Sequence, residues 1–237
     1  MADSETFGVM TSGASTAALL ALQPALERVA GCAVQLLSHS IGIGATYIPN
    51  RLRLGEVADL VIVADDVLRQ CITDGLVVAD SRLPLVQSLV GMAVPAGEPR
   101  PDIATLECLK RTLLDAASIA YSASVSGQYL VDDLWPRLGV ADAVLPKARC
   151  ISDERIGAVV ARGEAAIGFE QMSELLPVPG IAHVTPLPPE AQKITIFSGG
   201  VAVCSPDPMR ARAVLQFLRS SVAHQAFVDS GLQPVAD

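Results

Sequence analysis

The stretch Leu60-Val61-Ile62-Val63-Ala64-Asp65-Asp66 decides the fold class. Its unbroken apolar run is typical of a central strand in a parallel sheet, because such a strand is covered on both faces. A helix is predicted to begin at Asp65 and to continue through Val67, Leu68 and Ile72, with Gly75 closing it. A strand that leads directly into a helix is the repeating unit of α/β proteins.

The same unit recurs on both sides of this stretch, and the cycle begins again after Pro84. Alternating strands and helices of this length predict open, mostly parallel sheets flanked by helices. The predicted strands are 7–10, 33–37, 60–63, 89–94, 118–121, 148–151, 166–169 and 194–203. The predicted helices are 15–30, 46–54, 65–75, 105–114, 126–138, 153–162, 172–176 and 208–220.

Composition excludes several classes of function. Of the 237 residues, 51% are hydrophobic and 18% charged, which is enough to bury a sizeable core. The net charge of −8, without a cluster of Lys or Arg, argues against binding of nucleic acid. No apolar run approaches the roughly 20 residues that cross a bilayer, so no membrane insertion is expected. An acidic protein can still bind an anion through backbone N–H groups and hydroxyls.

The cysteines bear on the compartment and on metal binding. All five are scattered, without a Cys-x-x-Cys pair or a His-Cys cluster, which predicts reduced thiols and no metal site. The first six residues are acidic rather than signal-like. The sequence therefore favours the cytoplasm, or the periplasm if an export signal has been removed, and it indicates no cofactor.

Four strand-to-helix turns carry unusual residues, and ligands of open α/β sheets lie at such turns. The first two are rich in small and hydroxyl residues, which leave backbone donors open to an anion. The candidates there are Ser12, Gly13, Ser15 and Thr16 in the first turn, and His39, Gly44, Thr46 and Tyr47 in the second.

The other two turns lie in the second half of the chain and add ionisable groups. Their candidates are Ser124, Ser126, Gln128 and Tyr129 in the third turn, and Arg155, Glu170 and Gln171 in the fourth. Each turn alone fits ordinary helix capping, but four together predict a site for a small anion at helix N-termini.

Several stretches resemble the periplasmic molybdate-binding family of type 2 substrate-binding proteins over nearly the whole chain. The most specific is Gly55-Glu56-Val57-Ala58-Asp59-Leu60-Val61-Ile62-Val63-Ala64-Asp65, and weaker ones run from Gly13, Ser88, Gly163 and Phe197. The resemblance implies a two-lobed type 2 periplasmic-binding-protein fold, each lobe a mainly parallel sheet flanked by helices, with the ligand cleft between the lobes. By this analogy lobe one comprises 1–84 plus 196–237, and lobe two comprises 85–195.

The sequence departs from the molybdate-binding pattern at two turns. The resemblance implies serines in the second turn and a tyrosine after the last strand, where this chain has Gly44-Ala45-Thr46 and Glu170-Gln171. A charged carboxylate beside a tetrahedral dianion costs several kcal/mol, so Glu170 disfavours molybdate.

Glu170 suits a ligand that exchanges a proton, and the superfamily includes aconitate isomerase. The leading hypothesis is therefore an aconitate-isomerase-like enzyme that catalyses an allylic proton shift between trans- and cis-aconitate. Glu170 or His39 would transfer the proton, assisted by Tyr47 or Tyr129, and the hydroxyl-rich turns would hold the carboxylates. The alternative is the substrate-binding protein of an ABC transporter, which delivers molybdate, tungstate or another small anion to a permease. A ligand-sensing domain is a third and weaker hypothesis.

Overall fold

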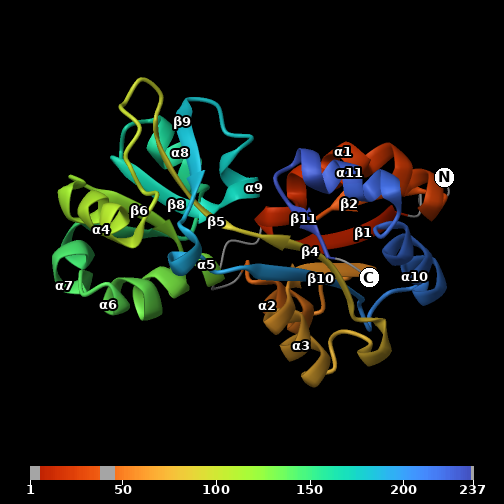
Figure 1. Cartoon of the computed structure of the whole chain (residues 1–237). Coiled ribbons are helices and arrows are strands. Elements are labelled where there is room, and N and C mark those ends of the chain that lie inside the picture. The colour runs from red at the N-terminus through yellow and green to blue at the C-terminus, as the bar shows by residue number, and fades with distance from the viewer. Residues whose placement is uncertain (1–5, 38–45, 236–237) are drawn as a thin grey trace. The chain divides into compact units, whose positions relative to one another are not determined.

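The computed structural model describes residues 6–37 and 46–235, which form two compact units. The chain passes from unit 1 to unit 2 between Ser88 and Leu89, and it returns between Ile194 and Thr195. Each unit holds one sheet with helices packed against it (Figure 1). The predicted α/β class is confirmed.

Unit 1 contains a six-stranded sheet in the order β11-β4-β10-β3-β1-β2. Its elements are β1 (Thr6–Thr11), α1 (Gly13–Ala30), β2 (Ala33–Leu36), α2 (Ile48–Arg53), β3 (Leu60–Ala64), α3 (Asp65–Thr73), η1 (Ala79–Ser81), β4 (Leu83–Ser88), β10 (Thr195–Val201), α10 (Pro208–Phe217), α11 (Ser221–Asp229) and β11 (Gln233–Pro234). β3 is buried along its whole length, because helices cover both faces of the sheet. Val61 and Val63 pack towards α2 and α3, and α1 packs against α10 and α11.

Unit 2 contains a five-stranded sheet in the order β7-β6-β8-β5-β9. Its elements are β5 (Val90–Pro95), α4 (Leu106–Asp115), β6 (Ile119–Ser122), α5 (Val125–Tyr129), the π-helical segment η2 (Leu130–Leu134), α6 (Trp135–Arg137), α7 (Ala141–Val144), η3 (Leu145–Lys147), β7 (Ala148–Ile151), α8 (Ile156–Ala161), β8 (Ile167–Gln171), α9 (Met172–Leu175), β9 (Ile181–Pro186) and η4 (Pro189–Ala191). Buried residues around Trp135, Phe169 and Met92 form the larger core of this unit, and α8 covers a second, smaller core.

Each sheet is mixed, which refines the expectation of mainly parallel sheets. In unit 1, β2, β1 and β3 pair in parallel, whereas β10 is antiparallel to both β3 and β4. In unit 2, β7, β6 and β8 pair in parallel, whereas β5 is antiparallel to β8 and β9. The parallel strands carry the strand-to-helix turns, so their carboxyl ends still gather at one edge of each sheet.

Some boundaries differ from the prediction for local physical reasons. Pro84 suggested a break, yet it lies within β4, where the pairing with β10 shifts register at a bulge that tolerates proline. The predicted helix 153–162 begins only at Ile156, because Arg155 is its extended N-cap. The structure also adds β9, β11, α7 and α11, which the pattern did not predict.

Asp65 joins α3 to β10 and to Arg82, the residue before β4. Its carboxylate accepts two hydrogen bonds from Arg82, at 2.7 and 2.8 Å, and one from Ser198. Burial alone would raise the pKa of Asp65, but the hydrogen bonds from Arg82, Ser198 and Arg69 outweigh it and hold that pKa well below its usual range. Asp65, in the fold-deciding stretch, therefore stabilises the packing of α3 against β10 and the start of β4.

Candidate functional site

The first predicted turn, in unit 1, presents two buried hydroxyls at the start of a long helix. The N–H of Ser12 donates to the carbonyl of Ile62 at 3.0 Å, which fixes the end of β1 against β3. The hydroxyl oxygens of Ser12 and Ser15 are buried and have no hydrogen-bond partner within the part of the chain that the structure describes. Together with the first-turn N–H groups of α1, these hydroxyls can bind an anionic group.

Other residues of the first two turns have different surroundings. The Thr16 hydroxyl donates to the carbonyl of Ser12 at 3.3 Å, so its proton is already used. Thr46 is exposed, and Tyr47 is a half-buried N-cap of α2. Burial, with a smaller effect of Cys71, raises the pKa of Tyr47, so its phenol stays protonated at neutral pH. His39 and Gly44 lie outside the described residues.

The third predicted turn, in unit 2, gathers three serine hydroxyls. The Oγ atoms of Ser122 and Ser124 lie 2.6 Å apart, and those of Ser124 and Ser126 lie 3.0 Å apart. Ser122 and Ser126 are buried, whereas Ser124 is only partly buried. The turn needs glycine at position 127, because a Cβ there would lie 1.7 Å from the Ser122 carbonyl oxygen. We call Ser122, Ser124 and Ser126 the serine cluster.

Two candidates of the third turn do not join the serine cluster. The Tyr129 hydroxyl donates to the carbonyl of Ala191 at 2.8 Å and accepts from Arg137 at 3.0 Å. Tyr129 thereby holds the segment around η4, and Gln128 is exposed. The helical run after this turn contains the π segment η2 rather than the single regular helix 126–138 that was predicted.

The fourth turn buries a carboxyl group at the end of β8. Glu170 is 3% exposed, and its Oε2 accepts the N–H of Ile156 at 3.2 Å. Burial and the nearby carboxylate of Glu174 raise the pKa of Glu170 well above its usual range, although Arg155 opposes the shift. Gln171, the next residue, is also buried. The raised pKa favours the protonated form of Glu170 and makes this residue a candidate acid–base group.

The serine cluster and Glu170 lie at the same edge of the sheet in unit 2. β6 and β8 are parallel neighbours with Tyr121 aligned to Phe169. Ser122, the last residue of β6, and Glu170, the last but one of β8, therefore lie at the same end of adjacent strands. The strand ends therefore bring together hydroxyl donors and a buried carboxyl whose pKa is raised.

Sequence reasoning missed Glu174, a second carboxyl near Glu170. It lies on α9 and is only partly exposed. Burial raises the pKa of Glu174 to about 7, although Arg155 works against the shift. A carboxyl four residues after Glu170, across a strand-to-helix junction, was the signal that could have identified it.

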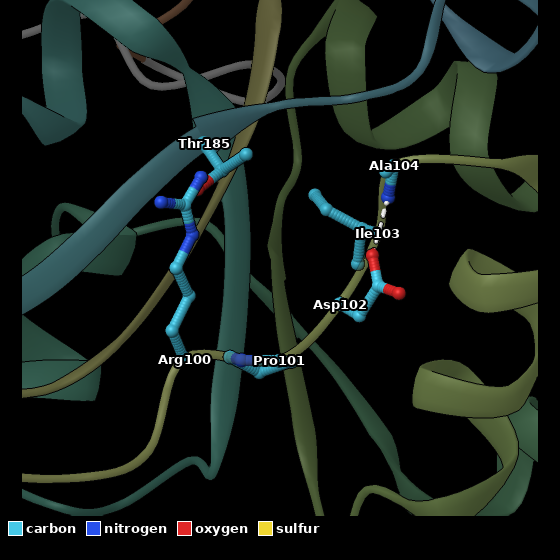
Figure 2. Close-up of a pocket in the computed structure, with 6 residues that line it drawn as sticks. All are labelled: Arg100, Pro101, Asp102, Ile103, Ala104 and Thr185. Carbon is cyan, nitrogen blue, oxygen red and sulfur yellow. Dashed lines mark hydrogen bonds between the residues drawn. The ribbon is translucent and has the colours of Figure 1, made fainter.

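One surface pocket lies apart from these candidates. It measures about 250 Å³ and is lined by the segment 100–104 and Thr185 (Figure 2). Figure 2 shows the hydrogen bond from the Ala104 N–H to the Asp102 carboxylate, at 2.9 Å, which shapes this turn. None of the predicted site residues lines the pocket.

Among the residues that the structure describes, no helix combines the length and the apolar character needed to cross a bilayer. Over the same residues, no group of three or more His, Cys, Asp or Glu side chains could hold a metal ion.

Solved structures define the class of protein to which this fold belongs. The periplasmic molybdate-binding protein of Azotobacter vinelandii matches with a TM-score of 0.76 and 16% identity, over 98% of this chain and 99% of that chain. Peb3 from Campylobacter jejuni matches with a TM-score of 0.72 and 13% identity, over 96% of this chain and 99% of that chain. The chain has the fold of the periplasmic binding proteins.

The sequence comparisons then give the family. The model of the bacterial extracellular solute-binding proteins matches residues 7–233, and the chain belongs to that family. An aconitate isomerase from a Pseudomonas species is 44% identical over 231 residues, which cover 97% of this chain and 88% of that protein. The resemblance seen in the sequence, including its aconitate isomerase branch, is confirmed.

Proposed function

We propose that this protein is an isomerase of the aconitate isomerase type, which interconverts trans- and cis-aconitate. The observation that carries the proposal is the buried Glu170, with its raised pKa, at the same sheet edge as the serine cluster. The 44% identity to an aconitate isomerase supports the substrate.

The reaction needs one proton to leave one carbon and one to reach another, two carbons away. In the proposed mechanism, Glu170 in its carboxylate form takes a proton from the methylene carbon. As that C–H bond breaks, its electron pair moves the double bond along by one carbon. A proton then forms a new C–H bond at the former vinylic carbon, so the atoms balance and no redox partner is required. His39 remains the alternative candidate for the proton-transfer group.

Hydroxyls and backbone N–H groups would hold the substrate's carboxylates. In unit 2 the serine cluster offers three hydroxyls at the strand end that carries Glu170. In unit 1, Ser12 and Ser15 offer buried hydroxyls at the N-terminus of α1. Arg155, Gln171 and Tyr47 complete the proposed binding residues. Such donors recognise carboxylates without a strongly basic surface, in keeping with the net charge of −8.

Thermal unfolding with a panel of anions tests the proposal against transport of an oxyanion. We expect trans-aconitate to raise the melting temperature, because a ligand at about 100 times its Kd stabilises the folded state by roughly 2.7 kcal/mol. Absorbance should then change on incubation with trans-aconitate as the cis isomer forms. Stabilisation by molybdate or tungstate, without turnover of aconitate, would instead establish a transport receptor.

A Ser15→Ala variant tests the proposed carboxylate-binding role of α1. Ser15 is fully buried and its hydroxyl has no partner among the described residues, so its removal should leave folding nearly unchanged. We expect roughly tenfold to a hundredfold weaker binding, since a hydrogen bond to a charged group contributes about 1.5–3 kcal/mol. Calorimetric titration with trans-aconitate measures the effect, and Ser221→Ala, at an exposed position, is the control. Unchanged affinity in Ser15→Ala would remove this hydroxyl from the site.

The compartment is a separate proposal. All five cysteines are free thiols, which supports a reducing environment and hence the cytoplasm. The family description, extracellular solute-binding protein, supports export instead. Fractionation of cells that express the native gene decides between the two, and a periplasmic location would overturn the cytoplasmic proposal.

A further inference from the structure

Two glutamate residues of unit 2 lie on the two sides of the junction between β8 and α9. Glu170 is the last residue but one of β8, and Glu174 is the third residue of α9. α9 packs against β8, β5 and α8. The residue opposite Glu170 on β5 is Gly91, where a Cβ would lie 2.4 Å from the Met172 sulfur. Glycine at this position therefore leaves room for the side chain of Met172, the first residue of the helix that carries Glu174.

The charges around this junction do not balance if both carboxyls are ionised. Glu170 is fully buried and Glu174 is partly buried. Two charged groups act on Glu170: the carboxyl of Glu174 and the guanidinium of Arg155, the N-cap of α8. The residue opposite Glu170 on β5 is Gly91, which carries no charge. Two carboxylates and one guanidinium would leave an uncompensated negative charge in a buried place, which is strongly unfavourable.

We propose that Glu170 and Glu174 act as one carboxyl pair that holds a single proton, with Arg155 balancing the remaining negative charge. The catalytic role of the pair rests on the proposed isomerase function, whereas the existence of the pair does not. Glu174 is a positioning residue that acts through Glu170: it stores the proton of Glu170 and so frees Glu170 to act as a base. After the substrate has lost one proton and gained one, the pair again holds a single proton.

The raised pKa values of both groups agree with this arrangement. Burial raises the pKa of Glu174 to about 7 and that of Glu170 well above its usual range, with Arg155 opposing both shifts. A proton acceptor with a pKa near 7 is well matched to proton transfer at neutral pH.

The amide of Ile156 offers a direct readout, because it donates to Glu170 Oε2 at 3.2 Å and its chemical shift should follow the ionisation of that carboxyl. We would record this shift by NMR against pH in the ligand-free protein, for the wild type and for Glu174→Gln. Loss of the neighbouring carboxylate should lower the midpoint by about one pH unit or more, the size expected for two strongly interacting groups. Glu164→Gln, which removes an exposed carboxylate of the same unit, should leave the midpoint unchanged.

An unchanged midpoint in Glu174→Gln would overturn the carboxyl pair. If that variant fails to fold, Glu174→Asp takes its place, because it retains a carboxyl and should keep the wild-type midpoint. A midpoint in Glu174→Asp far below that of the wild type would also contradict the pair. The pH dependence of kcat/KM is the second readout, and its acidic limb should move to lower pH in Glu174→Gln. Because the NMR titration uses no substrate, a protein that shows the shift but no aconitate turnover would retain the pair and refute the isomerase function.

Discussion

Replacing Glu170 with glutamine should lower kcat/KM for trans-aconitate by about 10²- to 10⁴-fold, the usual contribution of general acid–base catalysis. Glutamine has nearly the shape of a protonated glutamate but can neither take nor return a proton. Binding should change much less than turnover, because the serine cluster and the N-terminus of α1 keep their donors. Turnover and affinity measured on the same preparation separate the two effects.

Stability shows whether a loss of activity comes from lost chemistry or from unfolding. A carboxyl whose pKa is raised in the folded state penalises folding once the pH exceeds its unfolded pKa, because the unfolded chain releases the proton first. Glu170→Gln removes that penalty, so at neutral pH the variant should melt no lower than the wild type. Glu164→Gln is the matched control and should keep full activity. Full activity in Glu170→Gln would exclude Glu170 as the base and leave His39 as the candidate to test.

Replacing Gly127 with alanine should destabilise unit 2 and disrupt the serine cluster. The added methyl group would lie 1.7 Å from the Ser122 carbonyl oxygen, and the nearest atoms are backbone, which cannot rotate away as a side chain does. Overpacking of this kind costs about 3 kcal/mol, which corresponds to a fall in melting temperature on the order of 10 °C. Thermal unfolding measures the fall, and calorimetric titration measures the loss of affinity for trans-aconitate.

Gly8→Ala is a matched control for Gly127→Ala. At Gly8 the nearest atom to an added Cβ is a Leu37 side-chain carbon at 3.4 Å, an ordinary contact. The control should therefore keep a melting temperature close to that of the wild type. If Gly127→Ala also melted like the wild type and bound trans-aconitate normally, the tight turn between Ser122 and Gly127 would be irrelevant to the serine cluster.

Local signals in the sequence were enough to predict the parallel strands of each sheet and the turns that follow those strands. The apolar run at Leu60 predicted β3 because a strand covered on both faces must be apolar throughout. The long helix after Ser12 followed from leucines at helical spacing, and Leu19, Leu22 and Leu26 are buried. Strand β4 was missed because Pro84 is tolerated only at a bulge, which depends on the partner strand β10.

Some features of the candidate site could likewise be predicted from the local sequence, whereas others depend on tertiary packing. The sequence by itself determined which strand-to-helix turns are rich in hydroxyls and that an acidic residue, Glu170, follows the predicted strand 166–169. It could not determine that Glu170 is buried, because burial arises from α8 and α9 packing on the sheet, far from any local pattern. Only the tertiary structure buries Glu170 and places Glu174 near it; burial first, and then the charge of Glu174, raise the pKa of Glu170 against the opposing charge of Arg155.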